Sequence, residues 1–120
     1  MVKTHEYIPS RGDVILINCD PQSGQEQSGF RPSLVLSQYA YNKATGMVLV
    51  CPITSSKGLH KLQIEIPEGF KVSGVIIADQ IKSFDFKERN GKEYCKLPDK
   101  FVLKIVDILS KIIGFNLQNQ

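Results

Sequence analysis

Short runs of apolar, largely β-branched residues follow one another along this sequence, and polar segments with proline or glycine separate them. Short apolar runs bounded by such turn signals predict strands. The predicted strands span residues 13–19, 33–37, 47–51, 62–66, 74–84 and 93–97. The run 62–66 alternates between apolar and polar residues, which predicts one dry and one wet face, whereas the more continuous runs indicate buried strands.

Turn signals define how these strands are predicted to end and connect. Pro21 ends the first strand and Pro52 stops the pairing of the third, because proline removes a ladder donor. Residues 39–46 are predicted to be a connection that closes in a turn. The charged, glycine-containing residues 87–92 are predicted to form the turn of a hairpin that continues into 93–97.

The C-terminal part of the sequence changes its period. Its apolar residues recur at spacings of three and four, which predicts one stripe of a helix: Phe101, Ile105, Ile108, Leu109 and Ile112. Pro98 and Asp99 suit the first turn of this helix, and Lys111 and Gly114 suit its end. Six or seven short strands followed by one helix predict a mainly β fold, a small and strongly curved antiparallel sheet or barrel, in a single domain over residues 1–120.

Composition narrows the classes of function. The net charge of +3 is mild, whereas strong non-specific nucleic-acid binders are usually more basic. There is no long apolar run, so we expect no membrane span, and the N-terminus has no apolar core of a signal peptide. Cys19, Cys51 and Cys95 lie far apart beside apolar runs without metal-ligand spacing. Buried free thiols, and hence a cytoplasmic location, are expected.

Residues 23–37 carry the strongest functional pattern. Gly24 and Gly29 bracket a polar stretch that contains Glu26, and Arg31 then leads into an apolar run. Glycines let a backbone approach a ligand closely, and loops on rigid scaffolds often carry binding and catalysis. The guanidinium of Arg31 is always charged and presents a fork of donors that suits phosphate. A phosphate-binding loop that ends on a strand is therefore predicted.

Several different short motifs follow one another along the sequence in a characteristic order. They are Gly12-Asp13, Asp20-Pro21, Gly24-x-Glu26-Gln27-x-Gly29-x-Arg31-Pro32-x-x-Val35-Leu36-Ser37, Tyr41-Asn42-x-x-Thr45-Gly46, Pro52-x-Thr54-Ser55, Lys57-Gly58 and Ala78-Asp79-Gln80-Ile81-Lys82-Ser83. Each is weak evidence alone, but the order and spacing together are specific. From about Pro9 to the end of the last helix, the sequence resembles the MazF/PemK messenger-RNA interferase toxins of bacterial type II toxin–antitoxin systems.

The resemblance implies an SH3-like barrel with a C-terminal helix. It also implies a ribosome-independent endoribonuclease that cuts single-stranded RNA at short motifs, without a metal or another cofactor, and leaves 2′,3′-cyclic phosphate and 5′-hydroxyl ends. Such toxins inhibit translation and growth. They work as homodimers, and a cognate MazE-like antitoxin neutralises them by occupying the RNA groove.

Cleavage through the RNA 2′-hydroxyl needs a base, an acid and donors that stabilise the phosphorane charge. By resemblance, Arg31 and Thr54 carry this reaction. An arginine suits phosphoryl charge but is a very poor base at neutral pH, so its chemistry supports electrostatic stabilisation more firmly than proton transfer. Thr54 and Ser55 can each donate a hydroxyl hydrogen bond. Glu26 is the candidate to orient Arg31 or to act as the base.

Single-stranded RNA is read through hydrogen bonds to base edges and through stacking. The residues predicted to contact RNA are Gln27, Ser28, Phe30, Ser55, Lys57, Gln80 and Lys82. Phe30 could stack on a base or cap the core, and Lys57 suits phosphate better than a base. Residues 79–83 either read RNA or support the dimer, or they form a bulge or a sheet edge.

Alternatives stay open at this point. Arg31 could form a surface ion pair, Thr54 and Ser55 could satisfy a turn, and Glu26 could be solvated. His5 and His60 lie in an arm and a loop, which disfavours a two-histidine mechanism. Because fold does not fix function, a non-catalytic toxin that inhibits DNA gyrase on the same barrel is the rival class. Such toxins act through a C-terminal tryptophan, and this sequence contains none. An RNA-binding module with an inactive site is the third possibility.

Overall fold

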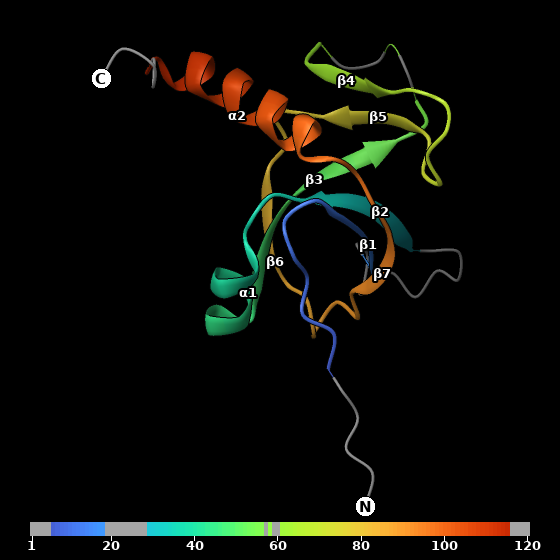
Figure 1. Cartoon of the computed structure of the whole chain (residues 1–120), viewed down its shortest axis with the longest axis vertical. Helices are drawn as coiled ribbons and strands as arrows, with labels where there is room; N and C mark the ends of the chain where they lie inside the picture. Colours follow the sequence, from blue (N-terminus) through green and yellow to red (C-terminus); the bar gives the residue numbers. More distant parts are fainter. Residues whose placement is uncertain (1–5, 19–28, 57, 59–60, 116–120) are drawn as a thin grey trace, which may run out of the picture.

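The computed structural model describes residues 6–18, 29–56, 58 and 61–115. Within these residues it contains seven strands and two helices. They are β1 (Asp13–Asn18), β2 (Phe30–Val35), α1 (Tyr39–Thr45), β3 (Met47–Thr54), β4 (Gln63–Ile66), β5 (Gly74–Ile77), β6 (Lys82–Asp85), β7 (Lys92–Lys96) and α2 (Asp99–Ile113). Figure 1 shows α2, β4 and β5 gathered at one end of the molecule, with the other strands curled below them.

β3 is the strand on which the sheet divides. Along one edge it pairs with β2, which pairs in turn with β1 and then β7. Along its other edge, the first half of β3 pairs with β6 and its second half with β5, which continues to β4. These pairings are antiparallel and the sheet curls strongly without closing (Figure 1). The predicted mainly β, barrel-like fold with a C-terminal helix is confirmed.

Both faces of the central strands are buried, which explains their continuous apolar runs. One face packs with β4, β5 and α2, and the other packs with β6 and the turn after it. The first cluster includes Val14, Leu34, Cys51, Ile76 and Phe101, and the second includes Ile15, Ile17, Val35, Val50 and Phe86. Alternation along each strand sends neighbouring side chains to opposite clusters, so the register is set by two cores at once.

A short helix, α1, occupies residues that were predicted to be a connection. The prediction was wrong because seven residues are too few to show a helical period. The predicted turn at Gly46 is confirmed as the end of this helix, where the glycine adopts φ 75° and its N–H bonds to the carbonyl of Asn42.

The prediction that Pro52 stops strand pairing was wrong. β3 runs on past it, and Pro52 lies opposite Ser33 of β2. Leu49 directs its N–H and C=O toward the residues that follow β2, so Pro52, three residues later, directs its nitrogen to the opposite edge. There the β6 pairs end at Val50 and the β5 pairs begin at Ile53, so the proline removes no ladder bond.

Two further predictions about strands need correction. Residues 74–84 do not form one strand, because a turn at Ala78 and Asp79 separates β5 from β6, with the N–H of Gln80 bonded to Ile77. Residues 87–92 do not form a hairpin turn in the described structure. They carry the chain from β6, beside β3, to β7, beside β1, so they link the two edges of the curved sheet. Sequence pattern cannot distinguish a hairpin from such an edge-to-edge connection.

The predicted C-terminal helix is confirmed as α2. Pro98 is its N-cap and Gly114 its left-handed C-cap, as the sequence indicates. Phe101 and Ile105 are buried together with Val102, and each such side chain contributes roughly 1.5–3 kcal/mol on burial. Ile112 was predicted to belong to the buried stripe but is 53% exposed, because the last turns of α2 extend beyond the sheet (Figure 1).

Polar side chains fix the N-terminal segment to the barrel, and we call Tyr7, Asp13, Asn42 and Lys96 the N-terminal anchor. Asp13 is 5% exposed and accepts hydrogen bonds from the Tyr7 hydroxyl and the Ser10 N–H. The Lys96 ammonium lies 2.9 Å from its second oxygen. Asn42 is fully buried; its amide donates to the carbonyls of Pro9 and Ser37.

The described cysteines are free thiols. Cys51 is buried as predicted and Cys95 is half-buried, while Cys19 lies outside the described residues. Burial, with a smaller contribution from the Asp79 carboxylate, raises the pKa of Cys51 from 9.0 to about 12. Burial also raises the pKa of Cys95. In the described part of the chain, neither helix has the length and apolarity needed to cross a membrane.

Candidate functional site

A surface groove opens where β2 and β3 separate. The pairing between these strands ends at Ser33 and Pro52. Two residues further along each strand, the same register brings Arg31 opposite Thr54. At this point β2 continues beside β1, and β3 continues beside β5. The space between the two diverging strands is therefore framed by the two residues that the sequence analysis singled out.

Pro32 explains why the strands separate here. The N–H of Leu36 bonds to the carbonyl of Leu49. Backbone groups alternate in direction along a strand, so the even-numbered residues of β2 direct their N–H and C=O groups toward β3. Pro32 therefore occupies the position of the next N–H donor toward β3, and proline has no such donor. The ladder loses a bond at this position, and the exposed strand ends become available to a ligand.

The resulting groove has a volume of about 360 Å³. Its lining comes from the first residues of β2, the end of β3 and the residue before β5: Phe30, Arg31, Pro32, Ile53, Thr54, Ser55, Ser56 and Ser73. One cation and four hydroxyl groups thus converge on an open space, which is a donor set suited to phosphate oxygens. Four of the predicted site residues, Phe30, Arg31, Thr54 and Ser55, share this groove.

Arg31 is exposed in the groove and has no ion pair with another described residue. The alternative of a surface ion pair is therefore not seen among those residues. An arginine without a carboxylate partner keeps its donor fork for an incoming anion.

Thr54 is held at the end of β3 by local contacts. Its hydroxyl oxygen accepts the N–H of Ser56 at 3.1 Å, which confirms the turn-satisfying role. That contact uses a lone pair, so the hydroxyl proton remains able to donate into the groove. Gly74 packs directly against this point: a Cβ there would lie 2.3 Å from the Thr54 carbonyl oxygen, and its φ is 116°. Only glycine allows β5 to begin this close to Thr54.

The other predicted RNA contacts are distributed differently. Phe30 lies outside both core clusters and is 46% exposed, so it does not cap the core. Gln80 and Lys82 are exposed on the β5–β6 turn and on β6, and neither lines the groove. Residues 79–83 form the turn and strand start that separate two ladders, which fits the structural alternative of an irregular sheet edge.

Four predicted site residues lie outside the described residues: Glu26, Gln27, Ser28 and Lys57. His5 and His60 do so as well. Conversely, sequence reasoning missed Ser56 and Ser73 as lining residues. Ser56 continues the Thr54-Ser55 hydroxyl run and could have been included, whereas Ser73 reaches the groove only because β5 pairs with β3. No sequence signal indicates that pairing.

Metal binding has no candidate site in the described part of the chain. Among those residues, no group of three or more histidine, cysteine, aspartate or glutamate side chains is placed to hold an ion. The polar groups that the described residues contribute to the groove are a guanidinium and hydroxyls.

The fold and groove define a class: small, curved β-barrels that present a cation and hydroxyl groups at diverging strand ends. Residues 10–113 match the family described as PemK-like, MazF-like toxin of type II toxin-antitoxin system. The chain is 40% identical to the endoribonuclease toxin MazF of Escherichia coli K12 over 85 residues, which is 71% of this chain and 76% of that protein. The chain therefore belongs to the PemK/MazF toxin family.

Two further similarities span more of the chain. It is 38% identical to the endoribonuclease toxin ChpB of Escherichia coli K12 over 108 residues, covering 85% of this chain and 90% of ChpB. It also superposes on a chain of a MazE–MazF crystal structure from Deinococcus radiodurans with a TM-score of 0.80 and 30% identity. That match covers 92% of this chain and 100% of the other. The family resemblance predicted from sequence is confirmed.

Proposed function

We propose that this protein is the toxin of a type II toxin–antitoxin system and acts as an endoribonuclease whose active site is the groove between β2 and β3. The substrate is single-stranded messenger RNA, cut at a short sequence motif without the ribosome or a metal ion. Loss of this messenger RNA inhibits translation and growth. The observation that carries the site assignment is that Arg31 and Thr54, which lie on diverging strands, line one open groove. Among the described residues, Arg31 has no ion pair there.

In the proposed reaction, the 2′-hydroxyl oxygen attacks the adjacent phosphorus and loses its proton. The bond from phosphorus to the 5′ oxygen breaks, and that oxygen leaves with a proton. The products are a 2′,3′-cyclic phosphate and a 5′-hydroxyl. Arg31 binds the phosphoryl oxygens and stabilises the negative charge that develops on them, and Thr54 donates a hydrogen bond to the same group.

Proton transfer needs a further group, because an arginine keeps its proton at neutral pH. We propose that Glu26 orients Arg31 or accepts the 2′ proton. Ser55 donates a second hydroxyl hydrogen bond from the groove wall. Gln27, Ser28, Phe30 and Lys57 contact the flanking nucleotides. Gln80 and Lys82 lie away from the groove, so they contact RNA only if the strand continues past it.

The test is a cleavage assay on a long single-stranded RNA in EDTA, with primer extension to map the cuts. Wild type, Arg31→Ala and Arg31→Lys are compared, and thermal melting checks that each is folded. Wild type should cut at one recurring motif. Arg31→Ala should cut about 10²–10³-fold more slowly, since a preorganised donor to the transition state is lost. Arg31→Lys should be intermediate, because it keeps the charge without the fork.

Wild-type protein that is folded but makes no cuts would refute the endoribonuclease assignment, and gyrase inhibition or RNA binding without cleavage would be tested next. Arg31→Ala protein that cuts at the wild-type rate would refute the site while leaving the activity.

Two copies of this single domain are proposed to form the active homodimer. A groove along α2 supports this. The Arg11–Asp99 ion pair forms part of its lining, and its four other lining residues are apolar: Leu36, Val102, Leu103 and Val106. Leu103 and Val106 are exposed in the single chain. Light scattering at micromolar concentration should give twice the 13.4 kDa mass, and a monomer would contradict the proposal.

The proposed partner is a cognate MazE-like antitoxin. The similarity to a chain of a MazE–MazF structure supports it, and the open cationic groove suits an acidic tail that orders on binding. Such a tail would cover Arg31 and exclude RNA. We place the pair in the cytoplasm, where messenger RNA is found and where free thiols such as Cys51 stay reduced.

A further inference from the structure

β1 brings one residue of β7 next to the groove. In the two ladders of β1, Leu16 lies opposite Pro32 of β2 on one side and opposite Lys92 of β7 on the other. Residues opposite one another point to the same face of a sheet, and Phe30, two residues before Pro32, shares that face. The Lys92 ammonium accordingly lies 5.1 Å from the centre of the Phe30 ring.

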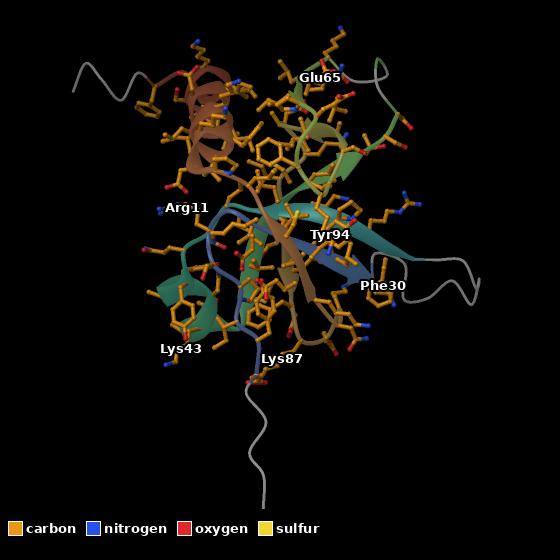
Figure 2. All side chains as sticks on the ribbon, turned by 45° about the vertical axis from the view of Figure 1, so that its right-hand side comes forward. Arg11, Phe30, Lys43, Glu65, Lys87 and Tyr94 are labelled. Atoms are coloured by element: carbon orange, nitrogen blue, oxygen red, sulfur yellow. The ribbon has the colours of Figure 1, made fainter. Side chains whose placement is uncertain are left out.

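Phe30 presents its ring to solvent at the start of β2. Figure 2 shows it at the edge of the molecule, beside the end of the barrel. It lines the same groove as Arg31, its neighbour in sequence. Because Phe30 and Arg31 both line this groove, an RNA strand bound through Arg31 has the Phe30 ring within its reach.

Among the described residues, Lys92 has no salt bridge, unlike the other lysines of β7 and of the preceding turn. Lys96 pairs with Asp13, and Lys87 pairs with Glu6. Within the described residues, the Lys92 ammonium lies over the Phe30 ring and has no salt bridge. Its charge is therefore not neutralised by a carboxylate among these residues.

A second lysine–aromatic pair, Lys71 and Tyr94, packs on the core and gives a comparison for Lys92 and Phe30. Lys71 lies 4.3 Å from the centre of the Tyr94 ring and donates a hydrogen bond to the Tyr94 carbonyl. Tyr94 itself packs against the core cluster under α2. That pair closes over the core, whereas Phe30 and Lys92 stand free of it beside a groove.

We propose that Phe30 and Lys92 form a nucleotide subsite next to the cleavage position. The base adjoining the cut phosphate stacks on the Phe30 ring, and the Lys92 ammonium contacts a backbone phosphate. This subsite rests on the proposed function, since it assigns a place to RNA in the same groove. It adds a residue of β7, Lys92, that the motifs of the sequence do not indicate.

Stacking and charge predict different signatures in binding. The probe is a fluorescein-labelled, mixed-sequence 2′-O-methyl RNA, which cannot be cut because its 2′ oxygens carry methyl groups. Fluorescence anisotropy over a range of salt concentrations gives the affinity and its salt slope. Lys92→Gln should lower the affinity at low salt and reduce the slope by about 0.7, the value expected for one contact to single-stranded phosphate.

Phe30→Leu should weaken binding by about fivefold or more with an unchanged slope, because it removes a stacking surface but no charge. Phe30→Tyr keeps the ring and should bind as wild type does. Lys43→Gln is the matched control: it removes one exposed lysine charge from α1, which Figure 2 shows well away from Phe30. It should leave the slope and affinity unchanged.

Lys92→Gln behaving like Lys43→Gln, or Phe30→Leu binding as wild type, would overturn the subsite. The cleavage assay keeps this separate from the proposed function. If wild type cuts and Arg31→Ala does not, but the Phe30 and Lys92 variants are neutral in binding, the subsite alone fails. If binding depends on Phe30 and Lys92 and no RNA is ever cut, the subsite stands and the endoribonuclease assignment fails.

Discussion

The N-terminal anchor and the groove are both rich in polar side chains. In the anchor these side chains are bonded to other protein groups, whereas in the groove they face open space. In the N-terminal anchor, Asp13 and Asn42 are buried, and their polar atoms bond to the Tyr7 hydroxyl, a lysine and backbone groups. In the groove, Arg31 and the hydroxyl groups around it face open space. Buried polar groups left unpaired are costly, so the anchor's pairing serves stability.

In the groove, in contrast, Arg31 has no salt bridge to another described residue, and its donors face solvent until a ligand binds. The comparison separates two uses of the same residue types. Variants in the groove should change activity and leave stability nearly intact, while variants in the anchor should do the reverse.

The largest effect that sharpens this contrast is expected from Thr54→Val. It keeps the branched shape but removes the hydroxyl, so cleavage should slow about 100-fold if Thr54 donates to the developing phosphoryl charge. The hydrogen bond lost to Ser56 is exposed, so the free energy of unfolding should change by less than about 1 kcal/mol. Single-turnover cleavage and urea unfolding measure the two quantities.

Thr54→Ser is the control for this experiment, because it retains the hydroxyl and should keep most of the activity. Cleavage by Thr54→Val at the wild-type rate would reduce Thr54 to its turn-forming contact and blur the contrast between the two regions.

Asn42→Ala should produce the next largest effect, this time on stability. It removes an amide that is fully buried and leaves the carbonyl of Pro9 without its donor, so unfolding should become about 2–3 kcal/mol easier. Lys43→Ala, on the exposed face of the same helix, should stay within about 0.5 kcal/mol of wild type.

Urea titration measures both variants, and the cleavage rate per folded molecule should be unchanged. A loss of activity in Asn42→Ala that exceeds its loss of folded protein would show that the anchor also supports the groove.

Alkaline pH should have the smallest effect within the first pH unit of its onset, and it should act through the buried Cys51 and the half-buried Tyr7. Burial raises the pKa of Cys51 to about 12. Burial and the bond to Asp13 also raise the pKa of Tyr7. Both groups keep protons in the folded state that the unfolded chain releases, so stability is full below about pH 9 and falls as pH rises above it.

Each retained proton contributes at most about 1.4 kcal/mol per pH unit. Cys51→Ala should flatten the decline that begins near pH 9, and Tyr7→Phe should flatten the part that begins near pH 10. Urea unfolding across this pH range tests both. Alkaline slopes identical to wild type in the two variants would contradict the burial argument.

Prediction from sequence succeeded where a local pattern carries the physics. The period of residues 101–109 placed α2, and Pro98 and Gly114 placed its ends. It failed where pairing with a distant strand decides the outcome. Pro52 continues its strand because two different strands share one edge of β3, and residues 87–92 cross between sheet edges instead of forming a hairpin.

The site divides in the same way. Motif order pointed to Arg31 and Thr54, but the sequence does not show which strand register brings them into one groove. They line one groove because the β2–β3 register, continued past Ser33 and Pro52, sets them opposite one another, and because Pro32 lacks the N–H that would bond β2 to β3 at this point. Lys92 shows the limit more sharply, since only its place opposite Leu16 brings it to Phe30.

By itself, then, the sequence determined the mainly β fold class, the C-terminal helix, the family and the residue types that suit phosphate. Those properties depend on local preference, periodicity and motif order, which are written along the chain. Only the tertiary structure decided which strands share an edge, where a ladder ends, and which cations have no salt bridge to another described residue. Those outcomes depend on contacts between residues far apart in sequence, and burial in two cores at once selects among them.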